Sequence, residues 1–198
     1  MHRASYDGLA PRYADTNAAM PAAVEAAAEK FVKLLRPGGK VLDLGCGHGR
    51  DAASLAARGV VVTAVDLSAG MLVQAVERFD GPVSQGDMRR LPVRSAAFDG
   101  VWSNAAMLHL AKRDLRGTLT EVHRVLKDRG VAFVSFQVGE GEAWEPVSYG
   151  VSLRRFFARY SVGEFARGVE SVGLSVLGME ESEGGPLRHW AHVYARKE

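Results

Sequence analysis

The stretch Val41-Leu42-Asp43-Leu44-Gly45-Cys46-Gly47-His48-Gly49-Arg50 joins a short apolar run to three alternating glycines and then to a helical pattern. A strand that enters such a turn ends at the carboxyl edge of a sheet, where glycines permit positive φ angles and let a ligand approach the backbone. The helix that follows offers unpaired N–H groups to an anion. A glycine-rich turn can also be purely structural, so the turn alone predicts a candidate ligand site and not its chemistry.

The segments around this turn alternate between strand and helix. The pattern predicts strands at 40–44, 60–65, 83–85, 98–102 and 131–138, and helices at 21–35, 50–58, 68–79 and 113–126. Strands that alternate with helices pair in parallel and are covered on both faces. We therefore expect a doubly wound α/β fold.

The last forty residues break this alternation. Ser161 and Glu164 form a capping box for one more helix, and strands at 174–179 and 189–195 follow with only a glycine-rich turn between them. Two strands joined without a helix pair antiparallel. The predicted fold is thus a mostly parallel, seven-stranded Rossmann-like sheet with an antiparallel last strand.

Composition narrows the class of protein. The chain has 198 residues, is 47% hydrophobic and 24% charged, and carries 25 Lys plus Arg against 23 Asp plus Glu, a formal charge of +2. This balance predicts one domain over residues 1–198 and no dedicated nucleic-acid partner. No apolar stretch is long enough for membrane insertion, the single cysteine excludes an internal disulfide, and no metal-ligand spacing occurs. We expect a cytoplasmic protein, with a bacterial source suggested by the Ala, Gly, Arg and Val bias.

An acidic residue at the end of the second strand indicates a nucleoside. Asp66 lies 21 residues after Gly45, where a carboxylate can accept two hydrogen bonds from a ribose diol. Its alternative role is to cap the helix that begins near Ser68. A nicotinamide enzyme predicts the same acid, but its loop reads Gly-x-Gly-x-x-Gly, and the carboxylate of Asp43 would repel a pyrophosphate. A ligand with an amino-acid end would tolerate that acid.

These residues resemble the class I S-adenosylmethionine-dependent methyltransferases, and the resemblance runs from about Tyr13 to Tyr194. It implies that S-adenosylmethionine is the cofactor. It also implies that Asp66 binds the ribose, that Leu67 lies beside the adenine, and that Asp87 binds the adenine amino group. The remaining cofactor residues implied by the resemblance are Tyr13, Asp43, Gly45, Cys46, Gly47, Gly49, Met88 and Asn104.

The acceptor is predicted from less constrained regions. Ser103-Asn104-Ala105-Ala106 lacks the Asn/Asp-Pro-Pro-aromatic element of enzymes that methylate nucleobases or glutamine, which favours a small-molecule acceptor and methylation of oxygen or nitrogen. An N-terminal cap and helix (1–36) and a lid connection (139–160) would enclose it. The predicted acceptor-binding residues are Tyr6, His109, Trp144, Tyr149, Phe157 and Tyr160.

His109 is the candidate catalytic residue, because histidine titrates near neutral pH and follows the fourth strand at the functional edge. It could equally line the site without moving a proton. Three functions remain open at this point: a methyltransferase, a nicotinamide-dependent oxidoreductase and a non-catalytic nucleoside-binding module. The oligomeric state is not predicted.

Overall fold

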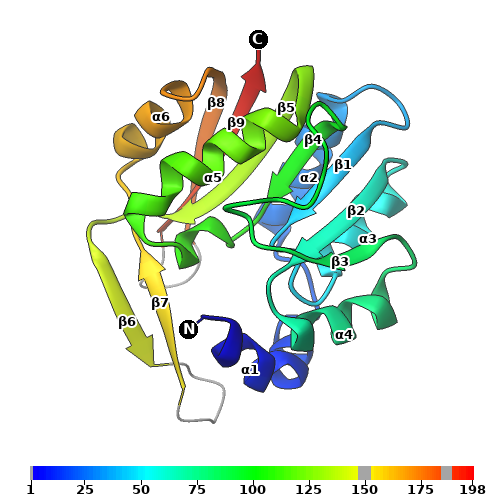
Figure 1. The fold of residues 1–198 in the computed structure, drawn as a ribbon, viewed down its shortest axis with the longest axis vertical. Coiled ribbons are helices and arrows are strands. Elements are labelled where there is room, and N and C mark those ends of the chain that lie inside the picture. The colour runs from blue at the N-terminus through cyan, green and yellow to red at the C-terminus, as the bar shows by residue number, and fades with distance from the viewer. Residues whose placement is uncertain (1, 147–152, 184–188) are drawn as a thin grey trace.

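A seven-stranded sheet forms the centre of the computed structural model, which describes residues 2–146, 153–183 and 189–198 (Figure 1). The strand order is β3-β2-β1-β4-β5-β9-β8, and β9 is antiparallel to both of its neighbours. The predicted fold class is confirmed. The strands are β1 (Lys40–Leu44), β2 (Val61–Asp66), β3 (Val83–Gln85), β4 (Phe98–Ser103), β5 (Leu126–Gln137), β8 (Leu174–Glu183) and β9 (His189–Lys197).

Helices cover both faces of this sheet. On one face, α2 (Ala22–Lys33) and α3 (Arg50–Ala57) bury Phe31 and Leu55 against Trp102 of β4. On the other, α5 (Lys112–Val125) and α6 (Val162–Glu170) bury Leu119 and Phe165. Burying each such side chain stabilises the fold by about 1.5 to 3 kcal/mol. No helix in the described ranges is both long and apolar enough to cross a membrane.

The strand register brings the functional ends together. Asp43 of β1 pairs with Ala64 of β2 on one side and with Trp102 of β4 on the other. The last residues of β1, β2 and β4 therefore end at one edge of the sheet, which faces α1 (Figure 1). This is the edge at which ligands bind in open α/β sheets.

The N-terminal segment is a helix, α1 (His2–Thr16), where the sequence predicted only a cap of unspecified structure. It lies between α4 (Ala69–Arg78) and strand β7 (Arg154–Ala158), and two side chains attach it there (Figure 1). Ser5 Oγ donates to the Arg154 carbonyl at 2.9 Å. Asp7 Oδ1 accepts from Ser68 Oγ at 2.6 Å and from the Gly70 N–H at 2.9 Å.

The predicted lid connection is partly a β-hairpin. Strands β6 (Glu142–Pro146) and β7 pair antiparallel, so that Trp144 lies opposite Phe156 with ring centroids 5.6 Å apart. Aromatic cross-strand pairs stabilise such two-stranded sheets. The predicted acceptor residue Tyr149 lies outside the described residues.

Alanine substitutions at two helical glycines, Gly70 and Gly117, test how closely α1 packs against α4. A Cβ on Gly70 would lie 2.8 Å from the Asp7 carbonyl oxygen, whereas a Cβ on Gly117 of α5 meets nothing within 4 Å. Gly117→Ala is expected to raise the free energy of unfolding by about 0.5 to 1 kcal/mol, because alanine loses less backbone entropy. Gly70→Ala should show no such increase in stability, because its Cβ would clash with Asp7 of α1, and hydrogen exchange in α1 should become faster. Equal gains from both variants in urea unfolding would contradict this docking.

Candidate cofactor and acceptor site

A cavity of about 540 Å³ opens at the carboxyl edge of the sheet. Its volume lies within the range of roughly 300 to 1,000 Å³ that is usual for small-molecule sites. The predicted cofactor residues that line it are Tyr13, Asp43, Gly45, Cys46, Gly47, Asp66, Leu67, Asp87, Met88 and Asn104. Tyr6, His109 and Trp144, predicted for the acceptor, line the same cavity. The two halves of the predicted site thus share one space.

The glycines of the loop differ in their surroundings. Gly47 has φ 54°, and a Cβ added there would meet nothing within 4 Å, so bare backbone faces the cavity. Gly45 has φ 78°, and a Cβ there would lie 2.3 Å from the Cβ of Ala106. Gly49 does not line the cavity, because its Cα faces α4, where a Cβ would come within 3.0 Å of the Ala75 Cα. Its role is in packing α3 against α4.

Asp66 fixes the glycine loop through a hydrogen bond to its backbone. Its Oδ2 accepts from the Gly47 N–H and its Oδ1 from the Ser68 N–H, both at 2.8 Å. Burial raises the pKa of Asp66, although these amide hydrogen bonds oppose the shift. Ser68 also caps α4, since its Oγ accepts from the Met71 N–H. The sequence suggested two roles for Asp66, ribose binding and helix capping. In the structure, the Asp66 carboxylate binds the backbone of the glycine loop and the backbone of Ser68, the N-cap of α4.

Asp43 is a buried acid in the wall of the cavity. Its side chain is almost completely buried, and its Oδ2 has no hydrogen-bond partner among the described residues. Burial, followed by the negative charges of Asp51 and Asp66, raises the pKa of Asp43 well above its usual value. The described residues form no three-ligand metal site. This wall is therefore suited to a positively charged group of a ligand.

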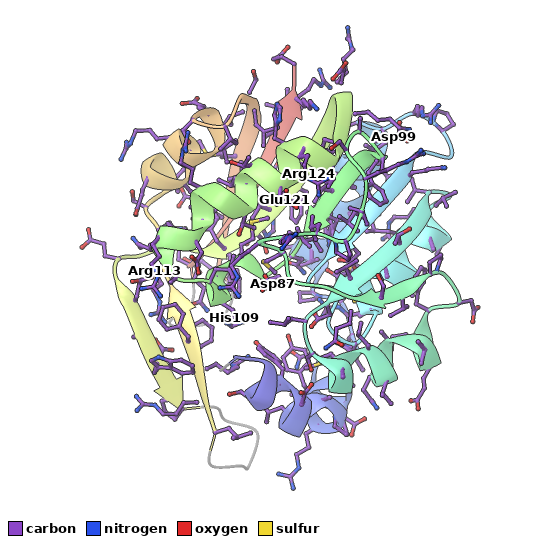
Figure 2. All side chains as sticks on the ribbon, viewed as in Figure 1. Asp87, Asp99, His109, Arg113, Glu121 and Arg124 are labelled. Atoms are coloured by element: carbon purple, nitrogen blue, oxygen red, sulfur yellow. The ribbon has the colours of Figure 1, made fainter. Side chains whose placement is uncertain are left out.

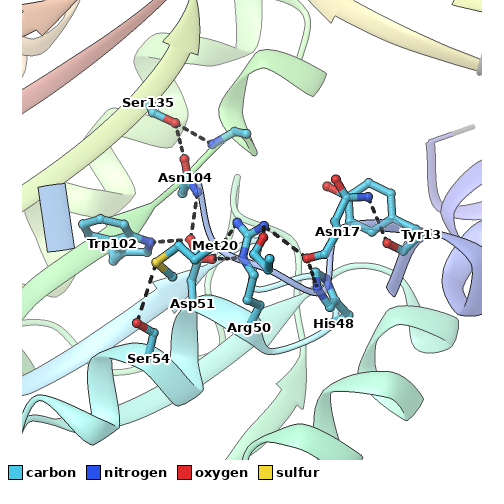
Figure 3. Close-up of polar contacts among 12 residues, drawn as sticks. Tyr13, Asn17, Met20, His48, Arg50, Asp51, Ser54, Trp102, Asn104 and Ser135 are labelled. Carbon is cyan, nitrogen blue, oxygen red and sulfur yellow. Dashed lines mark hydrogen bonds and ion pairs between the residues drawn. The ribbon is translucent and has the colours of Figure 1, made fainter. Parts of the chain in front are cut away.

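Asp51, which the sequence did not single out, organises the neighbouring wall (Figure 3). Its Oδ2 accepts from Trp102 Nε1 at 3.0 Å and from Asn104 Nδ2 at 2.8 Å, while Arg50 Nε donates to Oδ1 at 2.8 Å. Asn104 Oδ1 in turn accepts from Ser135 Oγ at 2.5 Å. Both polar ends of Asn104 are thus engaged within the protein, and the network orients its side chain at the cavity.

His48 connects the glycine loop to the N-terminal segment. Its Nε2 lies 3.1 Å from the Asn17 carbonyl oxygen, and its ring meets that of Tyr13 edge to face at 5.6 Å (Figure 3). Burial, then the positive charges of Arg78 and Arg50, lowers the pKa of His48 to about 4. His48 is therefore neutral at pH 7 and adds no positive charge to the acidic wall.

Asp87 lines the cavity and is already paired with Arg89. Arg89 donates to it from Nη2 at 2.6 Å and from Nε at 3.0 Å, and this bond lowers the pKa of Asp87. Arg89 also reaches Asp114 at 3.4 Å. A ligand amino group would share the Asp87 carboxylate with Arg89, a partner that the Gly-Asp motif alone did not reveal.

The acceptor side combines residues from the N-terminal helix and from the middle of the chain. Tyr6 of α1, His109 of the short 3-10 helix η1 (Met107–His109) and Trp144 of β6 line the cavity, and so does Phe156 of β7. Figure 2 shows His109, Asp87 and Arg113 at the edge of the sheet that faces α1. Phe156 was not predicted for the site; strand alternation places it on the cavity face opposite Trp144.

Two predicted acceptor residues lie behind this wall. Phe157 is 6% exposed and packs on His109 with centroids 5.0 Å apart. Tyr160 is buried in the core against Phe136 and Phe165. Neither lines the cavity, because successive side chains of β7 point to opposite faces and Tyr160 follows the strand into the core. Arg113, at the cavity mouth, was also not predicted.

Comparison with known proteins agrees with this geometry. A family model described as "Methyltransferase domain" matches residues 41–130, which run from the glycine loop to the start of β5. A malonyl-[acyl-carrier protein] O-methyltransferase of Erwinia billingiae is 39% identical over 127 residues, covering 61% of this chain and 50% of that protein. This is a class I S-adenosylmethionine-dependent methyltransferase domain.

A second relative extends the match beyond the family model. The methyltransferase domain is 36% identical over 158 residues to the malonyl-[acyl-carrier protein] O-methyltransferase of Erwinia pyrifoliae, covering 76% of this chain and 58% of that protein. The chain spans about half the length of the curated relatives it matches. Their activity, substrates and partners are therefore carried to this chain only as proposals.

Solved structures share the fold of the methyltransferase domain at low identity. A Burkholderia thailandensis 1,6-didemethyltoxoflavin-N1-methyltransferase, solved with bound 1,6-didemethyltoxoflavin and S-adenosylhomocysteine, has a TM-score of 0.80 at 22% identity, covering 98% of this chain and 86% of that one. The [4+2]-cyclase SpnF has a TM-score of 0.75 at 20% identity, covering 98% and 95%. The fold is therefore shared by proteins with different named reactions.

Proposed function

We propose that this domain transfers a methyl group from S-adenosylmethionine to an oxygen or nitrogen atom of a small acceptor. The observation that carries the proposal is the buried Oδ2 of Asp43, which lacks a described partner beside the open backbone of Gly47. A ligand with a cationic centre and an amino-acid end fits an acidic wall next to bare backbone.

The other cavity residues fit the remainder of this cofactor. Asp66 carries a carboxylate that can accept from a ribose diol in addition to the two amides it already holds. Leu67 is 38% exposed and Met88 is partly buried, and both give the cavity an apolar wall for a purine ring. Asp87 offers an acceptor for an exocyclic amine. The residues present therefore suit the cofactor along its length.

When bound, S-adenosylmethionine supplies a methyl group that is already activated by its positively charged sulfur. The chain's own task is then to align an acceptor and to exclude water, which alone can lower the barrier substantially. Trp144 and Phe156 form an apolar wall on the acceptor side, and Tyr6 of α1 lines the same side. Helix α1 packs against both β7 and α4. The Asp51 network fixes the Asn104 side chain between the two halves.

The acceptor is proposed as a small molecule or a small acyl group. Arg113 and Arg89 at the mouth favour an acceptor with some negative charge. The malonyl group in the names of the relatives gives the carboxylate acceptor to test, which would be methylated on oxygen. An acceptor with an O–H or N–H group is the other class.

Two alternatives are less well supported. A nicotinamide-dependent oxidoreductase would have to place a pyrophosphate near the buried Asp43 and its acidic neighbours, which repel it. A non-catalytic nucleoside-binding module would use the same cofactor site, and a turnover assay separates it from a methyltransferase.

Calorimetry tests the cofactor class directly. S-adenosylmethionine and its product S-adenosylhomocysteine are expected to bind, and NAD to give no saturable heat, because the former pair brings an ammonium group to the acidic wall whereas NAD would bring a pyrophosphate there. Asp43→Asn keeps the shape of the side chain and should weaken S-adenosylmethionine without creating NAD binding. Tight NAD binding with no response to either sulfur nucleoside would overturn the proposal.

A further inference from the structure

Tyr6, His109 and the backbone of β7 form a continuous hydrogen-bond chain on the acceptor side of the cavity. The Tyr6 hydroxyl lies 2.6 Å from His109 Nε2, and His109 Nδ1 lies 2.7 Å from the Phe156 carbonyl oxygen. The two rings meet edge to face at 5.3 Å. Both Tyr6 and His109 line the cavity, and Phe157 supports the His109 ring at 5.0 Å.

The direction of each hydrogen bond follows from what its partners can do. A backbone carbonyl only accepts, so His109 Nδ1 must carry a proton and donate to Phe156. In a neutral imidazole the other nitrogen is then a base, so Nε2 accepts and the Tyr6 hydroxyl donates to it. Every further hydrogen bond to the Tyr6 oxygen is one that this oxygen accepts.

The charged group that faces this chain supports the same direction. Arg155 Nη1 donates to the Tyr6 oxygen at 3.4 Å, and its guanidinium lies over the Phe157 ring at 5.1 Å. Because the Tyr6 oxygen accepts from this guanidinium, its own proton is directed towards His109 Nε2. The Phe156 carbonyl, in turn, stabilises an imidazolium once one forms.

We propose that Tyr6 and His109 form a relay that removes a proton from the acceptor, and that the acceptor therefore presents an O–H or N–H group rather than a carboxylate. The inference rests on the proposed methyl transfer. The acceptor gives its proton to the Tyr6 oxygen as the Tyr6 proton moves to His109 Nε2, and the acceptor atom takes the methyl group as the carbon–sulfur bond breaks. His109 returns the proton to solvent after product release. His109 here acts through Tyr6, which touches the acceptor.

Nitrogen-15 NMR of the full chain with S-adenosylhomocysteine bound tests the resting state without any acceptor. The chain has six histidines, and His109→Asn identifies the resonances of His109. At neutral pH we expect a neutral ring protonated on Nδ1, and Tyr6→Phe should move the Nε2 resonance towards that of a nitrogen without a hydrogen bond. A doubly protonated ring, or a proton on Nε2, would overturn the relay, because Tyr6 would then be free to donate to a carboxylate.

A fluorinated tyrosine at position 6 tests proton transfer itself. The phenol of such a residue is more acidic, so its proton should pass to His109 and produce tyrosinate absorbance that disappears in His109→Asn. Fluorotyrosine at position 160, buried away from the cavity, serves as the matched control and should stay protonated. If the fluorotyrosine stays protonated at position 6, as it should at position 160, proton transfer to His109 is contradicted.

A kinetic experiment separates the acceptor classes, with malonyl-coenzyme A as the carboxylate probe. Absence of turnover of this probe agrees with a relay reserved for protic acceptors. Turnover that is equal in Tyr6→Phe and the parent would show a carboxylate acceptor that needs no relay, and would overturn the acceptor class. Turnover that falls tenfold or more in Tyr6→Phe, but not in Tyr160→Phe, would overturn the acceptor class. Failure of S-adenosylhomocysteine to bind the parent would instead remove the proposed function and leave the spectroscopic result on Tyr6 and His109 to stand alone.

Discussion

Gly47→Ala is expected to lower the affinity for S-adenosylhomocysteine by at least about 100-fold, a loss of about 2.7 kcal/mol. Gly47 turns its bare backbone to the cavity at φ 54°, and no atom of the protein lies within 4 Å of the position a Cβ would take. A methyl group there would occupy space that the ligand needs for close approach to the loop. The measurement is calorimetric titration of the folded variant.

Gly38→Ala is the matched control for backbone strain. Gly38 has φ 66° and a Cβ position that is equally open, but it lies before β1 and does not line the cavity. Both variants place alanine in a left-handed conformation at a cost of roughly 1 kcal/mol in stability. Only Gly47→Ala should lose the ligand. If both variants bind as tightly as the parent, the cofactor does not approach this loop.

Asp66→Ala is expected to weaken S-adenosylhomocysteine by about 30- to 300-fold, because it removes two functions at once. A charge-assisted hydrogen bond to the ribose contributes about 1.5 to 3 kcal/mol. The variant also frees the N–H groups of Gly47 and Ser68, which Asp66 now holds at 2.8 Å. Asp66→Asn should fall between the parent and alanine, since an amide presents only one acceptor oxygen to these two donors.

Asp99→Ala controls for the loss of a well-bonded carboxylate elsewhere. Asp99 lies at the start of β4, at the opposite end of the strand from the cavity (Figure 2). Although burial opposes the shift, hydrogen bonds from the Lys40 N–H, Lys127 and Arg36 lower the pKa of Asp99 to about 2. Its removal should reduce the free energy of unfolding and leave ligand affinity unchanged. Equal affinity of Asp66→Ala and the parent would refute the ribose assignment.

The sheet and its helices were predictable because their signals are local. The N-cap at Ser161 is confirmed by a hydrogen bond from the Glu164 N–H to Ser161 Oγ, while the Glu164 carboxylate accepts from Lys112 Nζ. The antiparallel pairing of β8 and β9 was correctly predicted from the glycine-rich turn in the sequence between them. The predicted strand 131–138 was too short, since β5 begins at Leu126 directly after α5. Leu126 is apolar and lies where α5 ends and β5 begins, so it fits both the helical and the strand pattern of apolar residues.

Helix α1 was not predictable by the same means. Its buried side chains, Leu9, Ala10 and Ala14, are few and small, and Pro11 interrupts the pattern. Its position depends on contacts with residues far along the chain, such as Arg154 and Gly70. Tertiary packing stabilises such a helix more than its own sequence does.

The cofactor half of the site was more predictable than the acceptor half for a related reason. Asp43 and Asp66 lie at strand ends and Gly47 lies in the loop directly after β1, so the fold alone brings them to one edge. Phe156 and Phe157 differ by a single position on β7, and which of them faces the cavity depends on the pairing with β6. Arg50 and Asp51 gave no motif, and their roles follow only from the side chains that surround them.

Helix α1 and the β6–β7 hairpin meet beside the cavity, since Ser5 of α1 donates to the Arg154 carbonyl of β7. Evolution can change the central sheet and these two peripheral segments, α1 and the hairpin, independently. The strand ends that line the proposed cofactor site belong to the sheet itself, so substitutions there act on the fold as well as on the site. The helix and the hairpin sit outside the sheet and contribute Tyr6, Trp144 and Phe156. Exchanging those two segments alone is a route by which this scaffold can acquire a new acceptor while keeping the same donor chemistry.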